Sequence, residues 1–253
     1  MSLDLILTGA AVLGAIIGSF LGAALERLPQ GRSVVTGRSA CDHCGTALGV
    51  QELVPVFSWG LQGGRCRTCG GRIGLWQLAC ELGAAVIAVA SVCLAPDGLR
   101  IAAMVFGWQL LLLGLLDLRH LWLPRALTLL LALNGLVLVG ARAFVAHDPA
   151  PLVTGLVGGA LGWSMLALVA FAYRRTRGRD GMGGGDPLLL GAIGLWLGPA
   201  GTIHAVLGAA IIGLLAALVL HFAGRRIAAD TALPLGTCMA AAAWPLFLFG
   251  AAA

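Results

Sequence analysis

The fold is decided by residues 186–223, which read DPLLLGAIGLWLGPAGTIHAVLGAAIIGLLAALVLHFA and carry a single formal charge, at Asp186. A helix needs about 20 consecutive apolar residues to cross the hydrocarbon core of a bilayer. The stretch therefore predicts membrane helices over 186–198 and 200–223. The first is too short to span alone, unless it is tilted or continuous with the second through Gly198-Pro199.

Similar apolar runs recur along the whole chain of 253 residues, of which 59% are hydrophobic and 11% are charged. A soluble domain carries about 25% charged residues, so this composition excludes a soluble globular protein. We expect an all-α, polytopic membrane bundle of about eight transmembrane helices, the first of them a retained helix without a signal-peptide cleavage site. The predicted helices cover residues 4–25, 78–95, 99–117, 122–144, 151–173, 186–198, 200–223 and 234–252.

Three segments follow from this path: a first transmembrane helix at 1–25, a cytoplasmic loop at 26–77 and a transmembrane core at 78–253. All sixteen basic residues are Arg. Fourteen of them fall on one side of the predicted bundle, and only Arg100 and Arg142 fall on the opposite side. By the positive-inside rule, the Arg-rich side is cytoplasmic and both termini are periplasmic. Because these residues set topology, we expect a lipid bilayer and no nucleic acid as partner. The other fourteen are Arg27, Arg32, Arg38, Arg65, Arg67, Arg72, Arg119, Arg125, Arg174, Arg175, Arg177, Arg179, Arg225 and Arg226.

Four cysteines in the first loop form two C-x-x-C pairs, Cys41/Cys44 and Cys66/Cys69, and each pair is followed directly by Gly. Two thiolates on one tight turn approach a metal together, and this spacing is typical of tetrahedral zinc. A disulfide would not persist in the reducing cytoplasm. We predict a structural zinc site that folds a loop too small to have its own core. A redox pair and unmetallated thiols are the alternatives.

Two carboxylates stand at the ends of apolar segments, where an acid is costly and a functional site is the default hypothesis. Asp117 ends the inward-running helix predicted at 99–117, and Asp186 opens the outward-running helix predicted at 186–198, 69 residues later. The predicted topology brings both to the cytoplasmic end of the bundle. Two carboxyls in one semi-dry pocket tend to share a proton, which is the arrangement of aspartic proteases. We therefore predict Asp117 and Asp186 as a catalytic pair.

Each carboxylate also has a structural interpretation. Asp186 followed by Pro187 is typical of a helix N-cap, and Asp117 could pair with Arg119 or Arg125 at the interface. The glycines before Asp186 favour the functional interpretation, because a chain without side chains leaves room for an extended peptide beside the carboxylate. We predict Gly183, Gly184 and Gly185 as this substrate-backbone loop, in the run Gly181-Met182-Gly183-Gly184-Gly185.

Motifs along nearly the whole chain resemble the bacterial type IV prepilin leader peptidase family, whose members process prepilins and type II secretion pseudopilins. The resemblance includes the paired cysteines, Asp117 with Leu123-Pro124, and the G-x-G-D element that ends in Asp186. It also covers Gly18-Ser19-Phe20-Leu21, Arg27-Leu28-Pro29, Val54-Pro55-Val56-Phe57-Ser58-Trp59, Gly64-Arg65-Cys66-Arg67 and Ala232-Leu233-Pro234-Leu235-Gly236.

This resemblance implies an inner-membrane aspartyl protease whose catalytic pair maps to Asp117 and Asp186. It implies cleavage of the prepilin after a Gly at the cytoplasmic face, and then N-methylation of the new terminus from S-adenosylmethionine. Three positions depart from the usual pattern of the family, which often has Asn at Gly22, Asp at Arg125 and Lys at Leu188.

The residues leave two other questions open. The rival function is a transporter or a catalytically inactive secretion scaffold, in which Asp117 and Asp186 would bind protons or cations. Two buried carboxylates offer no place for the methyl donor, so we expect methyl transfer to depend on the segment from Glu26 to Leu75, which has enough polar backbone and turns to hold it. The chain has no G-x-G-x-x-G donor loop, so this second activity rests on the resemblance. Glu52 and Glu81 are candidate partners for a cation or amine; their structural alternatives are a solvated acid and an interfacial cap.

Overall fold

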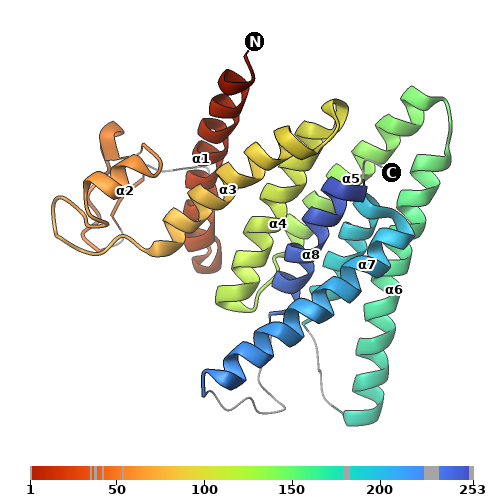
Figure 1. Cartoon of the computed structure of the whole chain (residues 1–253). Helices are drawn as coiled ribbons and strands as arrows, with labels where there is room; N and C mark the ends of the chain where they lie inside the picture. Colours follow the sequence, from red (N-terminus) through yellow and green to blue (C-terminus); the bar gives the residue numbers. More distant parts are fainter. Residues whose placement is uncertain are drawn as a thin grey trace. The chain divides into compact units, whose positions relative to one another are not determined.

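The computed structural model describes residues 2–34, 36, 39–41, 43–52, 54–178, 183–224 and 234–250. The regular secondary structure of these residues is helical, apart from two isolated β-bridges, and the described part of 31–74 consists mostly of turns and irregular backbone. The α-helices are α1 (Leu3–Arg27), α2 (Phe57–Leu61), α3 (Leu75–Leu94), α4 (Arg100–His120), α5 (Arg125–Ala146), α6 (Ala150–Arg177), α7 (Asp186–Phe222) and α8 (Leu235–Gly250) (Figure 1). Several residues singled out in the sequence lie outside the described residues, namely Arg38, Arg179, Gly181, Met182, Arg225, Arg226, Ala232 and Leu233.

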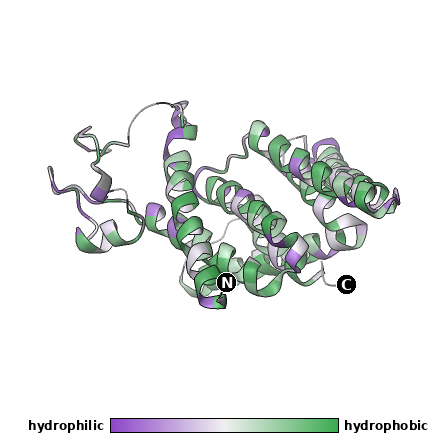
Figure 2. Cartoon of the chain, turned by 90° about the horizontal axis from the view of Figure 1, so that it is seen from above, coloured by the Kyte–Doolittle hydropathy of each residue, from purple (hydrophilic) through white to green (hydrophobic). Residues whose placement is uncertain are grey.

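Six of the described helices are long and apolar enough to cross a membrane: α1, α3, α4, α5, α6 and α7. The helix α8 is a shorter apolar helix. Large apolar side chains face outward on these helices; Leu214 and Val219 of α7 are 70% and 67% exposed. Figure 2 shows hydrophobic residues around most of the helical surface. A helix that is apolar all round needs lipid or protein on every side, so the predicted all-α, multi-pass membrane fold is confirmed.

The long helix α7 is broken at Gly198, where φ is 67° and ψ is −177°. Pro199 follows and cannot donate a backbone hydrogen bond, and the Thr202 hydroxyl donates to the Gly198 carbonyl at 2.7 Å. A Cβ added at Gly162 of α6 would lie 2.5 Å from the Leu190 oxygen and 3.1 Å from Thr202 Cγ2. Twelve residues of continuous helix would separate Leu190 and Thr202 by ~18 Å. The two limbs of α7 therefore fold back on each other.

This reversal explains how the short segment before Gly198 fits the bundle. The sequence predicts separate helices over 186–198 and 200–223, and the two limbs of α7 correspond to them. Counted with both limbs, the described residues provide eight apolar helical segments, in agreement with the predicted number. The other boundaries differ by a few residues. The largest difference is at α6, which continues to Arg177 because the first residue to end it is Gly178, at φ 67°.

Contacts divide the chain into two compact units, Met1–Leu112 and Leu113–Ala253, with the boundary inside α4. In the first unit, α1 packs along α3 through glycines. A Cβ added at Gly14 would lie 2.5 Å from the Ala84 oxygen, so only Gly permits this approach of the backbones. The Trp108 indole then donates to the same Ala84 carbonyl at 3.0 Å, which fixes the first half of α4 against α3.

In the second unit, α7 packs along α6, α5 and α8 (Figure 1). Trp196 of the first α7 limb joins three helices, because its indole donates to the Leu131 carbonyl of α5 at 2.9 Å and meets the Phe247 ring of α8 edge-on at 5.8 Å. Glycines bring α6 and α7 into backbone contact; a Cβ at Gly158 would lie 2.6 Å from the Gly198 carbonyl carbon. This packing fixes the start of α7, where Asp186 stands.

Candidate active site and cysteine cluster

Asp117 lies in the last turn of α4 and is 5% exposed. The helix ends three residues later, and Leu121 takes a left-handed conformation with φ 48°. The Asp117 Oδ2 atom accepts a hydrogen bond from the backbone N–H of Thr237 at 2.8 Å. Thr237 belongs to the first turn of α8, where backbone N–H groups have no partner within the helix. Asp117, which lies 120 residues earlier in the sequence, therefore provides the hydrogen-bond acceptor that this N–H of α8 lacks within its own helix.

Asp186 is the first residue of α7 and is 6% exposed. Its backbone N–H donates to the Gly183 carbonyl at 3.1 Å, which closes the turn before the helix. The N-cap position is Gly185, and no side-chain cap hydrogen bond forms there. The structural interpretation of Asp186 as an N-cap residue is therefore not what the structure shows.

The backbone beside each of the two acids packs against Leu123. A Cβ added at Gly236 would lie 2.9 Å from Asp117 Oδ2 and 3.1 Å from Leu123 Cδ1. A Cβ added at Gly185, the residue before Asp186, would lie 2.7 Å from Leu123 Cβ. The charge of Asp117 also acts electrostatically on Asp186. This interaction indicates that two acids 69 residues apart in the sequence lie near each other.

The three glycines before Asp186 have different surroundings. A Cβ at Gly184 would meet nothing within 4 Å, whereas one at Gly183 would lie 3.1 Å from Asp186 Oδ2. Gly185 instead packs against Leu123. Open space beside the acid is thus found at Gly184, and the missing side chain at Gly185 serves helix packing.

Thr237 is the residue of this site that the sequence did not indicate. Gly236, its neighbour, stands at the end of one of the motifs quoted above, but Thr in the first turn of a helix is unremarkable. The hydroxyl of Thr237 lies 2.8 Å from the Gly114 carbonyl and 3.3 Å from Asp117 Oδ2. A contact across 120 residues leaves no periodic pattern by which it could be predicted.

The four predicted zinc ligands meet in the first unit. Each cysteine pair forms the same turn: Gly45 donates to the Cys41 carbonyl and Gly70 to the Cys66 carbonyl, both at 2.9 Å. These glycines have φ values of 70° and 67°, which L side chains rarely adopt. The thiols of the cysteine cluster, Cys41, Cys44, Cys66 and Cys69, all lie within 4.8 Å of one another and form no disulfide.

This geometry fits zinc. A tetrahedron with Zn–S bonds of ~2.3 Å has sulfur atoms about 3.8 Å apart, and the sulfurs of Cys41 and Cys69 are 3.8 Å apart. Hydrogen bonds with the side chain and backbone of Thr46 lower the pKa of the Cys44 thiol to about 6. This lowered pKa favours the thiolate form of Cys44, which is the form that binds a metal.

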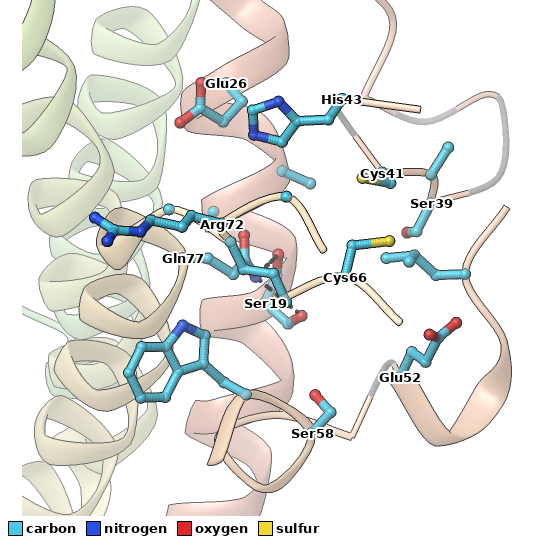
Figure 3. Close-up of a pocket in the computed structure, with 18 of the residues that line it drawn as sticks. Ser19, Glu26, Ser39, Cys41, His43, Glu52, Ser58, Cys66, Arg72 and Gln77 are labelled. Atoms are coloured by element: carbon cyan, nitrogen blue, oxygen red, sulfur yellow. Dashed lines mark hydrogen bonds between the residues drawn. The ribbon is translucent and has the colours of Figure 1, made fainter. Parts of the chain in front are cut away.

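A cavity of about 520 Å³ lies between the cysteine loop and the ends of α1 and α3 (Figure 3). Its walls include Cys41 and Cys66 of the cluster, so the turns that hold the cysteines also shape the cavity. The acids that line it are Glu26, Glu52 and Glu81, and the arginines are Arg27, Arg32 and Arg72.

Glu81 forms a buried anchor at this cavity. It is 5% exposed, and its carboxylate accepts bonds from Val56 N at 2.7 Å and Gln77 Nε2 at 2.9 Å. Val56 has φ 64°, a strained conformation for a β-branched residue. Glu52 behaves differently, since it accepts a bond from Gly49 N at 2.8 Å within its own turn. The side chain of Gln77 fills the space next to Gly22, where an added Cβ would lie 2.6 Å from Gln77 Cδ.

Comparisons with known proteins match both parts of the chain. The sequence model of the Bacterial Peptidase A24 N-terminal domain matches residues 12–95, and that of the Type IV leader peptidase family matches residues 104–218. The prepilin leader peptidase/N-methyltransferase of Burkholderia pseudomallei (strain 1026b) is 32% identical over 95% of this chain and 84% of its own length. The protein of the same name from Dichelobacter nodosus is 32% identical over 88% of this chain and 76% of its own length. That of Xanthomonas campestris pv. campestris is 31% identical over 95% and 90%. No solved structure matches the chain.

Proposed function

Because this chain belongs to the type IV leader peptidase family, we propose that it is a membrane-embedded aspartic endopeptidase that removes the leader of type IV prepilins or type II secretion pseudopilins. The observation that carries the proposal is that Asp117 and Asp186 are both buried, while Gly236 beside Asp117 and Gly185 before Asp186 both pack against Leu123. Relatives named prepilin leader peptidase/N-methyltransferase match most of the chain. The family therefore favours the peptidase over a transporter or an inactive scaffold.

For this reaction the two aspartates share one proton, so that one carboxyl is ionised and the other is protonated. The ionised carboxylate takes a proton from water as the water oxygen attacks the scissile carbonyl, and the protonated carboxyl donates its proton to the carbonyl oxygen. The tetrahedral intermediate then collapses: the C–N bond breaks, and the leaving amine receives a proton from the dyad. The open side of Gly184 provides room for the extended substrate backbone next to Asp186.

The test is cleavage of a prepilin peptide by the purified protein in detergent. Replacing either acid, as Asp117→Asn or Asp186→Asn, should lower kcat/KM by about a thousandfold or more, and the double variant should be no worse than either single one. Asp4→Asn, at an exposed position near the start of α1, is the matched control and should leave cleavage unchanged. Residual cleavage within about tenfold of wild type in either single variant would contradict the mechanism.

We propose N-methylation of the new N-terminus as the second activity, with the cavity beside Glu81 as the donor site. Its volume of about 520 Å³ falls in the ~300–1,000 Å³ range of small-molecule sites. Among the described residues that line it, Trp59 has a buried indole N–H with no hydrogen-bond partner. An unpaired buried donor is costly unless a ligand accepts its hydrogen bond, so this cavity fits a polar ligand.

S-adenosylmethionine, when bound, would supply the methyl group that is transferred to the amine. The residues suited to its positive charge are the carboxylates of Glu52 and Glu81 and the indole face of Trp59. All residues that line the cavity fall between 19 and 81, whereas the proposed dyad is at 117 and 186. The two activities should therefore be separable: Asp117→Asn should still transfer label from the donor to a pre-cleaved pilin peptide. Loss of transfer in a folded variant would show that the dyad serves both steps.

We propose a structural role for zinc at the cysteine cluster. Four thiolates leave no open coordination position, so the metal would activate no water and would hold the loop in its folded form. Cys41 and Cys66 line the cavity, and the zinc would therefore support the donor site through the walls that these residues form.

For the orientation in the membrane, we propose that the Arg-rich ends face the cytoplasm and that both termini are periplasmic. Four arginines among the described residues would then lie on the cytoplasmic side. They are Arg27 at the end of α1, Arg119 and Arg125 at the turn between α4 and α5, and Arg174 near the end of α6. A reporter that is active only in the periplasm should be active when it is fused to the C-terminus. Activity of a reporter that works only in the cytoplasm would contradict this orientation.

A further inference from the structure

Two hydrogen-bond donors of Thr237, at the start of α8, face the Asp117 carboxylate. The Thr237 N–H donates to Asp117 Oδ2 at 2.8 Å, and the Thr237 hydroxyl lies 3.3 Å from the same oxygen. The hydroxyl also lies 2.8 Å from the Gly114 carbonyl, one turn before Asp117 on α4. The Thr237 side chain thus lies between the Asp117 carboxylate and the backbone of α4, the helix that carries Asp117.

The hydroxyl of Thr237 has one proton and faces two acceptors. The separation from the Gly114 oxygen is that of a good O–H···O bond, and the separation from Asp117 Oδ2 is longer than usual. The distances therefore favour the Gly114 carbonyl as the acceptor of this proton. Rotation about the Cβ–Oγ1 bond would turn the proton toward Asp117 Oδ2, and a carboxylate anion is the stronger acceptor.

We infer that Thr237 is a positioning residue for the proposed dyad. Its N–H holds Asp117 Oδ2 in every protonation state, and its hydroxyl proton turns toward Oδ2 when Asp117 is ionised and toward the Gly114 carbonyl when Asp117 is protonated. No proton leaves the hydroxyl. With Oδ2 held in this way, Oδ1 is the Asp117 oxygen that exchanges protons with water and substrate. This inference rests on the proposed peptidase function.

Gly236 supports this arrangement. A Cβ at this position would lie 2.9 Å from Oδ2, so only Gly lets the first turn of α8 approach closely enough for the Thr237 N–H to reach the carboxylate. The N-terminus of a helix carries a partial positive charge, which further favours a carboxylate there. The position of Thr237 is therefore set by α8 rather than by its own side chain.

The test compares Thr237→Val, which keeps the shape and the N–H but lacks the hydroxyl, with Thr237→Ser, which keeps the hydroxyl. We expect Thr237→Val to lower kcat for prepilin peptide cleavage about tenfold with little change in KM, since one hydrogen bond to a charged group is lost. Thr237→Ser should stay within about twofold of wild type. Thr128→Val, which removes another buried hydroxyl, bonded to the Pro124 carbonyl, is the matched control and should keep the wild-type kcat.

A second measurement does not depend on turnover. In an Asp186→Asn background with isotope-labelled aspartate, the infrared carboxyl bands of Asp117 should shift when Thr237→Val is introduced and should stay in place with Thr237→Ser. Wild-type kcat in a folded Thr237→Val protein, or unshifted Asp117 bands, would overturn the role of the hydroxyl. If the wild-type protein cleaves no prepilin peptide while these bands do shift, the proposed function fails and the hydrogen bond stands.

Discussion

Gly236 is the position at which a single methyl group should do the most damage to the candidate active site. In Gly236→Ala, the new Cβ would lie 2.9 Å from Asp117 Oδ2 and 3.1 Å from both Asp117 Cγ and Leu123 Cδ1. Ordinary contacts between such atoms are about 3.5 Å, so the carboxyl group and α8 must separate by about 0.5 Å. Relief of this overlap should destabilise the protein by about 1–3 kcal/mol.

The same displacement acts on catalysis. A misplacement of about 1 Å can lower a rate about a hundredfold, and catalytic groups need to be held within about 0.5 Å. We therefore expect kcat for prepilin peptide cleavage to fall about tenfold to a hundredfold, with KM nearly unchanged because Asp117 acts in the chemical step. The assay is steady-state cleavage by detergent-purified protein, with the unfolding midpoint measured in parallel.

The matched control is Gly140→Ala in α5, where an added Cβ would meet nothing within 4 Å. Ala favours a helix over Gly by up to about 1 kcal/mol, so this variant should be as stable as wild type or more stable, and equally active. If Gly236→Ala keeps kcat within about twofold of wild type, Asp117 is not held against α8 in the working enzyme, and the geometry assigned to the dyad is wrong.

Three further predictions concern the cysteine cluster, the cavity and the break in α7. Elemental analysis should find one zinc per chain, and a Cys66→Ser change should release it and abolish methyl transfer while cleavage persists; metal-free wild type with full methyl transfer would contradict this. Glu81→Gln should weaken S-adenosylmethionine binding about tenfold in calorimetry without lowering cleavage, whereas equal loss of both activities would point to a folding defect. Gly158→Ala should lower the unfolding midpoint, because its Cβ would lie 2.6 Å from the Gly198 carbonyl carbon, and an unchanged midpoint would contradict the close packing of α6 against the break in α7.

The parts of the fold that follow from composition and local pattern could be predicted from the sequence. Apolar runs locate the membrane helices because lipid admits only segments that satisfy their own backbone hydrogen bonds. The break at Gly198-Pro199 is visible in the same way, since Pro cannot continue a helix through its missing N–H. The cysteine spacing indicates the cluster because two thiols on one turn must face the same point.

The contacts across long separations could not be predicted. Thr237 meets Asp117 across 120 residues, and Glu81 accepts the Val56 N–H across 25. Nothing local marks Val56 for a positive φ, because a β-branched residue is disfavoured there, and its N–H is bonded to an acid 25 residues away. Tertiary contacts of this kind depend on how helices pack, and a single sequence has no periodic signal for them.

The glycines near the two acids serve helix packing as well as the space predicted for a substrate. The sequence suggests that Gly183, Gly184 and Gly185 leave space for a substrate, yet Gly185 and Gly236 are the glycines that allow the first turns of α7 and α8 to pack against Leu123 and Asp117. As a result, two helix N-termini converge on the candidate dyad, each with the partial positive charge of its unpaired N–H groups. Peptide hydrolysis develops negative charge on the carbonyl oxygen, and fixed dipoles in a site shielded from water stabilise such charge strongly. Close helix packing and transition-state electrostatics therefore depend on the same two missing side chains.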